Sequence, residues 1–140
     1  MIVLDTNVIS EFVALNPDGN VTDWLDAQDG DDVYLTAVTV GELRAGVALL
    51  PTGKRKAMLS AEIEAYVEDV FLDRILSFDM GCTLQYAEVH RARTRRGRPV
   101  TDLDAQIAAI ALTYGATLAT RNTKDFDALG LELVNPWKAG

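Results

Sequence analysis

Short apolar runs alternate with longer stretches of helical periodicity along this chain. The apolar runs predict strands at residues 2–4, 33–35, 75–78, 117–120 and 131–134. Apolar residues at helical spacing predict helices at residues 8–13, 21–28, 36–50, 54–69, 81–96 and 101–114. Strands that alternate with helices at this spacing are typical of parallel βαβ units, so the predicted fold class is α/β.

The chain has 140 residues, and neither an internal repeat nor a linker interrupts it. We therefore expect one domain spanning residues 1–140. No apolar stretch reaches the roughly 18 residues that a membrane span needs, and the first residues lack the basic start of a secretory signal. These features predict a protein without membrane association, located in the cytoplasm.

Composition restricts the available chemistry. Cys82 and His90 are the only cysteine and the only histidine, which excludes an intramolecular disulfide and a metal site built on several thiolates or imidazoles. Acidic residues number 21 against 13 basic ones, for a net charge of -8. This balance argues against a general nucleic-acid coat, although it permits a local basic groove. Hydrolytic chemistry in this chain would have to depend on carboxylates.

Two aspartates lie where helices begin. Asp5 directly follows the first predicted strand, at the edge of the sheet where ligands bind in open α/β folds. Capping of the next helix is an equally good explanation for Asp5. Asp104 opens the helix at 101–114 on its inward face, where Thr101 could form a capping box with it. Asp102 points elsewhere around that helix and is expected to be solvated.

Glu42 is harder to explain structurally. Its helix is apolar almost all round, so we expect it to be largely buried, with Glu42 on a stripe with Val38, Ala45 and Leu49. A buried carboxylate needs either a metal or a basic partner. Arg44 or Arg121 could supply a salt bridge as the alternative to a metal.

Asp125 follows the strand at 117–120, and an Asn122 N-cap with Asp125 three residues later would explain it structurally. Four carboxyl groups at one sheet edge would raise one another's pKa unless a cation neutralised them. Oxygen ligands favour Mg²⁺ or Mn²⁺, which can activate water and stabilise a leaving oxygen.

At these positions the chain resembles the PIN-domain ribonucleases, specifically the VapC-like and FitB-like toxins of toxin–antitoxin pairs. The resemblance covers nearly the whole chain and depends on five segments in order: Leu4-Asp5-Thr6-Asn7-Val8-Ile9-Ser10-Glu11, Thr39-Val40-Gly41-Glu42-Leu43 with Gly46, Asp104-Ala105-Gln106-Ile107-Ala108-Ala109, Thr120-Arg121-Asn122 with Asp125-Phe126, and Asn135-Pro136-Trp137.

The resemblance implies a short, mainly parallel central sheet flanked by helices, and an endoribonuclease that uses Mg²⁺ or Mn²⁺. It also implies a homodimer silenced by a cognate antitoxin protein. The family's acids correspond to Asp5, Glu42 and Asp104, and the fourth role falls to Asn122, Asp125 or both. Thr6 and Thr120 match positions that line the family's pocket through their hydroxyl groups.

A basic segment interrupts the acidic chain with five arginines in eight positions: Arg91, Arg93, Arg95, Arg96 and Arg98. It is either a path for RNA towards the acidic site or a solvated helix end. Val47, Leu49, Leu50, Leu59, Ile63, Tyr66 and Val67 form either a groove for an antitoxin helix or ordinary core. Trp137 is expected to anchor the last strand.

The leading hypothesis is a metal-dependent endoribonuclease toxin. Asp5 and Asp104 would bind the metal, Glu42 would hold a metal-bound water and assist its deprotonation, and Asp125 would complete the outer shell. One alternative is a non-catalytic module that binds an antitoxin or nucleic acid, which would show no saturable metal binding. A phosphoacceptor or phosphatase domain is a third possibility, but Asn7 stands where that chemistry needs a second aspartate.

Overall fold

A parallel sheet forms the centre of the molecule. The computed structural model describes residues 1–138. The strands are β1 (Ile2–Leu4), β2 (Val33–Thr36), β3 (Ile75–Leu76), β4 (Thr117–Ala119) and β5 (Leu133–Val134). They lie in the order β3-β2-β1-β4-β5, and all four pairings are parallel. The predicted α/β class and the mainly parallel sheet are therefore confirmed.

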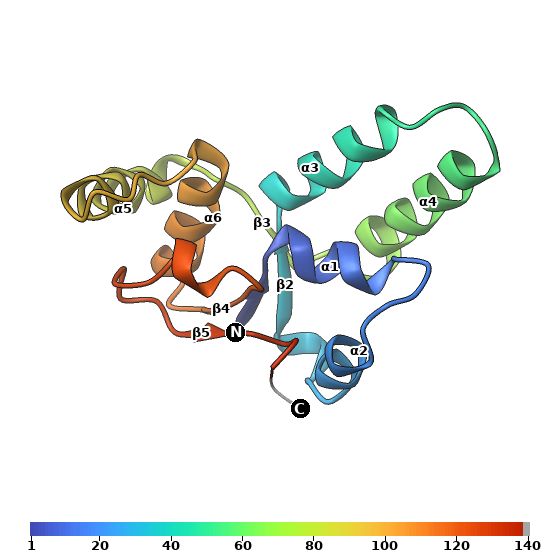
Figure 1. Cartoon of the computed structure of the whole chain (residues 1–140), viewed down its shortest axis with the longest axis horizontal. Helices are drawn as coiled ribbons and strands as arrows, with labels where there is room; N and C mark the ends of the chain where they lie inside the picture. Colours follow the sequence, from blue (N-terminus) through green and yellow to red (C-terminus); the bar gives the residue numbers. More distant parts are fainter. Residues whose placement is uncertain (139–140) are drawn as a thin grey trace.

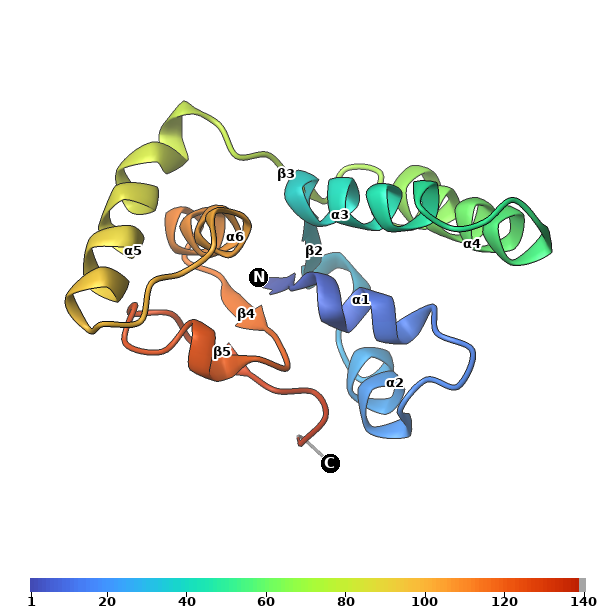
Figure 2. The same cartoon turned by 45° about the horizontal axis from the view of Figure 1, so that its top comes forward.

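Helices cover both faces of this sheet. They are α1 (Thr6–Phe12), α2 (Gly19–Asp26), α3 (Ala37–Ala48), α4 (Lys54–Ala65), α5 (Thr83–Arg95) and α6 (Asp102–Thr113). Figure 1 shows α5 and α6 on one side of the strands, with α1 to α4 on the other, and Figure 2 shows the same division after rotation. The polar residues Asp5, Thr36 and Thr101 cap α1, α3 and α6 with their side chains.

Alternating strand residues build a separate core on each face. Leu4 and Ala119 pack with apolar residues of α1 to α4, whereas Val3 and Leu118 pack with those of α5 and α6. This alternation is the period of two that a β-strand imposes on its side chains. Because the strands are parallel, their carboxyl ends lie along one edge of the sheet, and the segments that follow β1, β2 and β4 meet there.

Several predicted boundaries were too long. The strand predicted at 75–78 stops at Leu76, because its partner β2 ends at Thr36 and offers no further backbone to pair with. The strand predicted at 131–134 is reduced to Leu133–Val134, which pairs with Leu118 and Ala119. The helix predicted at 54–69 ends at Ala65 and continues as a wide π-helical turn, Tyr66–Val70.

The prediction that α3 is largely buried was wrong. Only Thr39, Val40, Leu43 and Val47 of this helix are buried, whereas Arg44 and Ala45 face solvent. Leu49, which was expected on an inward stripe, is 86% exposed. Strand β2 and helices α1, α4 and α6 contact one side of α3, and the residues on its other side are exposed.

Within residues 1–138, none of the helices combines the length and the apolar character needed to cross a membrane.

Candidate functional site

Asp5 is a buried carboxylate fixed by three neighbours. It follows β1, its exposed fraction is only 5%, and its Oδ1 accepts a 2.8 Å hydrogen bond from the Thr6 backbone N–H. Its Oδ2 accepts hydrogen bonds from the Thr120 hydroxyl at 2.8 Å and from Nδ2 of Asn7 at 3.3 Å. The side chain therefore caps α1, as the structural interpretation predicted, and is also held rigidly at the edge of the sheet.

Glu42 reaches the same edge from α3. The Thr6 hydroxyl donates a 2.8 Å hydrogen bond to Oε1 of Glu42, and the same hydroxyl lies 3.0 Å from that of Thr39. The predicted alternative, a salt bridge with Arg44 or Arg121, is wrong: Arg44 pairs with Glu64 at 2.6 Å, and Arg121 forms no salt bridge within residues 1–138. Glu42 is half-buried and holds its position through a hydroxyl rather than through a cation.

Asp104 enters the site from the first turn of α6. The Thr101 hydroxyl accepts a 3.2 Å hydrogen bond from the Asp104 backbone N–H, so Thr101 is the helix cap. Asp104 is partly buried, whereas Asp102 is exposed and accepts a hydrogen bond from the Tyr86 hydroxyl at 3.3 Å. The structure therefore directs Asp104 towards the sheet edge and Asp102 away from it.

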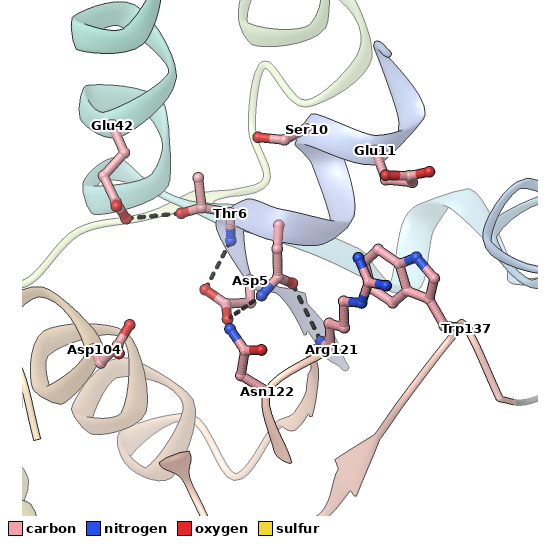
Figure 3. A pocket seen from close by; sticks show the side chains of 10 residues that line it. Asp5, Thr6, Ser10, Glu11, Glu42, Asp104, Arg121, Asn122 and Trp137 are labelled. Atoms are coloured by element: carbon pink, nitrogen blue, oxygen red, sulfur yellow. Dashed lines mark hydrogen bonds between the residues drawn. The ribbon is translucent and has the colours of Figure 1, made fainter. Parts of the chain in front are cut away.

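These three acids line one pocket of about 490 Å³. In the view of Figure 3, Glu42 and Asp104 lie on one side of Asp5, and Arg121 and Trp137 lie on the other. The full lining consists of Asp5, Thr6, Asn7, Ser10, Glu11, Glu42, Asp104, Arg121, Asn122 and Trp137. Segments from five parts of the chain thus meet at the carboxyl ends of the strands, where open α/β folds bind ligands.

Acidic residues outnumber basic residues in the lining of the pocket, where Arg121 is the basic one. Burial raises the pKa of Asp5 to about 6, and the charges of Asp104 and Glu42 add to the effect, while the Thr120 and Thr6 hydrogen bonds oppose it. Burial also raises the pKa of Asp104, with smaller contributions from Asp125 and Glu42. Within residues 1–138, neither these three acids nor Glu11, the fourth acid of the lining, forms a salt bridge with a basic side chain.

The fourth predicted acid lies outside this pocket. Asp125 is exposed, in a short 3-10 turn at Thr123–Asp125, and it approaches Asp104 closely enough to raise the pKa of that carboxyl. Asn122 lines the pocket and precedes that turn, but its side chain makes no capping hydrogen bond, contrary to the structural interpretation. Thr120 is fully buried and contributes through its hydrogen bond to Asp5.

Donor chemistry determines what this site could hold. Among residues 1–138, no three His, Cys, Asp or Glu side chains are grouped closely enough to ligate a metal by themselves. Mg²⁺ does not require such a group, since it keeps several waters and commonly binds proteins through one or two carboxylates. Four carboxylates line this pocket, those of Asp5, Glu11, Glu42 and Asp104, and none of them forms a salt bridge within the described residues. Such a pocket fits a hard cation of this kind.

The single histidine and cysteine lie elsewhere. His90 packs edge-on against Tyr86 at 4.7 Å on α5, and its Nε2 is 3.4 Å from Oδ1 of Asp102 without hydrogen-bond geometry. Cys82 is buried. Neither residue lines the acidic pocket, so its polar chemistry comes from carboxyl, hydroxyl, amide and guanidinium groups.

The arginine-rich segment separates into two kinds of residue. Arg93 is only 4% exposed, so its assignment to RNA binding was wrong. Its guanidinium donates to the Arg98 carbonyl at 3.0 Å and pairs with Oδ1 of Asp127 at 2.7 Å, which ties the end of α5 to the segment after β4. Arg91 is exposed and pairs with Glu88, and the remaining three, Arg95, Arg96 and Arg98, are exposed.

Sequence reasoning did not assign a role in the site to Asn7, Ser10, Glu11 or Arg121, although all four line the pocket. It assigned Trp137 to the last strand, and that side chain does pack against the core as well as lining the pocket. Asn7, Ser10 and Glu11 follow Asp5 within six residues, so helical spacing from Asp5 was the available signal. No local signal pairs Arg121 with Trp137.

Relatives of this chain were found by sequence. The Plasmid stability protein StbB of Pseudomonas syringae is 50% identical over 99% of this chain and 100% of its own length. VapC ribonuclease Y4jK of Sinorhizobium fredii is 42% identical over 99% of each chain. Toxin FitB of Neisseria gonorrhoeae is 43% identical over 98% of this chain and 99% of its own.

Solved structures of proteins of the same kind have a fold similar to that of this chain. The crystal structure of FitAcB from Neisseria gonorrhoeae matches with a TM-score of 0.92 at 43% identity, covering 99% of each chain. VapBC-5 from Mycobacterium tuberculosis, a member of the VapBC family of toxin–antitoxin systems, matches with a TM-score of 0.71 at 28% identity, over 95% of this chain and 96% of that one.

The family comparison extends over most of the sequence. Residues 2–131 match the PIN domain, a range that contains the three pocket acids and both threonines that hold them. The chain therefore belongs to the PIN-domain family, and it groups with the VapC-like and FitB-like members.

Proposed function

We propose that this protein is a metal-dependent endoribonuclease that acts as the toxin of a toxin–antitoxin pair. The observation that carries the proposal is the pocket shared by Asp5, Glu42 and Asp104, whose carboxylates have no basic partner within residues 1–138. Relatives named VapC ribonuclease and Toxin FitB support the same reading.

Asp5 and Asp104 would hold Mg²⁺ or Mn²⁺. Both carboxyl groups have raised pKa values. A bound cation would lower these pKa values, because it favours the charged forms. Such an ion supplies positive charge that polarises a phosphoryl oxygen and acidifies water. The Thr120 and Thr6 hydrogen bonds keep Asp5 in place, so it needs no rearrangement to act as a ligand.

Glu42 would accept a proton from the attacking water. Its Oε1 is occupied by the Thr6 hydroxyl, which leaves Oε2 as the free acceptor towards the pocket. Asn122 lines the same pocket and can donate amide hydrogen bonds to a phosphate, while Asp125 adds negative charge beside Asp104. These two residues would share the role that the resemblance assigns to a fourth acid.

RNA would approach along Arg95, Arg96 and Arg98, the exposed arginines of this segment that form no salt bridge within residues 1–138. Arg93 fixes the end of α5 by donating at 3.2 Å to the carbonyl of Lys124, the residue before Asp125. This contact brings the end of α5, with Arg95, and the loop after it, with Arg96 and Arg98, next to the short turn beside the acidic pocket. Their charge would attract the RNA backbone, and the cation would offset repulsion by the acids.

An antitoxin would bind the apolar groove that α1, α3 and α4 form. This groove has a volume of about 230 Å³ and shares Thr6, Ser10 and Glu42 with the acidic pocket. Of the predicted groove residues, Val47, Leu59 and Ile63 line it, whereas Leu49 faces solvent. A segment bound there would lie beside Glu42, which would couple antitoxin binding to silencing.

A homodimer is the assembly that we propose. Met80, in the short turn before α5, and Leu84, in its first turn, are 84% and 81% exposed. Pairing of two chains over this helix start would remove both side chains from water.

Mapping of RNA ends in cells tests the proposed activity. Induction of the wild-type chain should create new 5′ ends at defined positions, and induction of Asp5→Asn should create none. The exposed neighbour variant Asp102→Asn serves as the control that keeps the wild-type pattern. Identical RNA ends with and without the wild-type chain would refute nuclease action.

A further inference from the structure

Arg121 and Trp137 form a stacked pair in the acidic pocket that the proposed chemistry does not use. Cζ of Arg121 lies 5.1 Å from the centroid of the Trp137 ring, and both residues line the 490 Å³ pocket. Figure 3 shows the guanidinium laid over the indole, on the side of Asp5 away from Asp104. The pocket thus has Glu42 and Asp104 on one side of Asp5, and the planar cation of Arg121 on the other side, where Glu11 also lies.

Asparagine side chains form hydrogen bonds with the backbone of both Arg121 and Trp137 and hold the two residues in place. The Arg121 N–H donates to Oδ1 of Asn7 at 3.3 Å, and Nδ2 of Asn135 donates to the Arg121 carbonyl at 3.4 Å. Oδ1 of Asn135 also accepts from the Trp137 N–H at 3.0 Å, and Nδ2 of Asn20 donates to the Trp137 carbonyl at 3.0 Å. Asn135 therefore links the two segments, and their relative position is preset.

The charge of Arg121 is not used by another side chain. Within residues 1–138, Arg121 forms no salt bridge, although Glu11 lines the same pocket. Oε1 of Glu11 accepts instead from the Asp18 backbone N–H at 2.8 Å. Arg121 is exposed, whereas Trp137 is partly buried against the core. The indole therefore supports the face of the guanidinium that is turned towards the protein. The indole would keep the guanidinium plane oriented towards the pocket.

We propose that the Arg121–Trp137 pair is a nucleobase-stacking subsite that holds one unpaired base of the RNA beside the phosphate to be cleaved. This inference rests on the proposed function and adds how the substrate is held. Unpaired RNA bases stack on guanidinium planes and aromatic rings, whereas bases inside a duplex do not expose their faces. The subsite therefore selects single-stranded RNA and tolerates different bases, because every base has a π-face.

An abasic scan tests the subsite. The probe is a set of single-stranded RNA oligomers of equal length, each with one abasic ribose at a different position, and the protein is the full chain carrying Asp104→Asn. One abasic position should weaken binding by about 10-fold, in line with the energy of stacking one base. Fluorescence anisotropy at fixed salt and Mg²⁺ measures the affinities. Equal binding at all abasic positions would overturn the subsite.

Arg121→Lys distinguishes stacking from simple attraction to phosphate. Lysine keeps the charge but lacks the guanidinium plane. With this variant the sensitivity to the abasic position should disappear while the salt dependence of binding stays the same. If Arg121→Lys retained the sensitivity, or weakened all oligomers equally, the side chain would be a phosphate contact and the proposal would be wrong.

Trp137→Phe adds a second measure, because phenylalanine preserves much of the packing. It should reduce the abasic effect only partly, and a wild-type effect would contradict a role for the indole. Failure of the subsite and failure of the proposed function remain distinct. If the wild type cleaved RNA but bound all abasic oligomers equally, the subsite alone would be overturned. If the chain neither cleaved nor bound RNA, the subsite and the proposed function would both be overturned.

Discussion

The hydroxyl of Thr120 donates a 2.8 Å hydrogen bond to Oδ2 of Asp5, across 115 residues of sequence. Both side chains are buried where β1 and β4 end side by side. The contact is one of the few that stabilise the charged form of Asp5, whose pKa burial otherwise raises. Thr120 thereby keeps a buried carboxylate ready for a cation.

Replacement of this hydroxyl should weaken the site. Thr120→Val keeps the shape of the side chain but removes the hydrogen bond, so the pKa of Asp5 should rise further. A hydrogen bond to a charged group is worth about 2 kcal/mol, so the metal affinity should fall by about 10-fold or more. Calorimetric titration with Mn²⁺ measures this effect. Thr113→Val, which removes a hydroxyl bonded to the Ala109 carbonyl, is the control and should bind Mn²⁺ as the wild type does.

Asp5 should make the stability of the metal-free protein depend on pH. Its pKa is about 6 in the folded chain against 3.8 ordinarily, so the folded state holds the proton more tightly. The contribution of this group to stability is complete below about pH 3.8 and is lost as the pH rises through 6, at a cost of about 3 kcal/mol. Asp5→Asn should therefore be more stable than the wild type at pH 7.5 with EDTA.

Urea unfolding at pH 4, 5, 6 and 7.5 measures that difference. The advantage of Asp5→Asn should shrink towards pH 4, where wild-type Asp5 is protonated in the folded state and partly protonated in the unfolded state. Added Mg²⁺ should stabilise the wild type and leave Asp5→Asn unchanged. A constant difference between the two proteins from pH 4 to 7.5 would show that Asp5 does not titrate in this way.

Glu42 and Thr6 should affect turnover unequally. Glu42→Gln removes the proposed proton acceptor and should lower kcat by about 100-fold or more, because general bases contribute that much. Thr6→Val removes only the hydroxyl that orients Glu42, so a smaller loss of about 10-fold is expected. Single-turnover cleavage at saturating Mg²⁺ measures both rates. Equal losses in the two variants would place the base elsewhere.

The arginine-rich segment should show two distinct phenotypes. Arg93→Met leaves Asp127 and several carbonyls without their partner and should lower the free energy of unfolding by about 3 kcal/mol. Combined replacement of Arg95, Arg96 and Arg98 by Gln should leave stability unchanged and weaken RNA binding, with a shallower dependence on salt. Arg91→Gln is the matched control, since Arg91 already pairs with Glu88. Unaltered salt dependence in the triple variant would exclude these arginines from the RNA path.

Local sequence patterns predicted the helix starts and the strands, because these features depend on residues close together in the sequence. Asp5 and Asp104 follow from their positions at helix starts, and the five strands follow from short apolar runs. The exposure of α3 did not follow, because composition alone does not reveal how little sheet is available to cover a helix. The same reason applies to Arg93, which looked like one of five equivalent arginines until its carbonyl partners from another segment were placed around it.

The central claim is that the carboxylates at the end of the sheet cleave RNA with a divalent ion. Cleavage of an end-labelled single-stranded RNA by the purified chain, with Mg²⁺, with Mn²⁺ and with EDTA, tests it most directly. The wild type and Asp102→Asn should cleave with either metal and not with EDTA, and Asp5→Ala and Asp104→Ala should be inactive while remaining folded by circular dichroism. Cleavage that persists in EDTA, or at the wild-type rate in either alanine variant, would contradict the account.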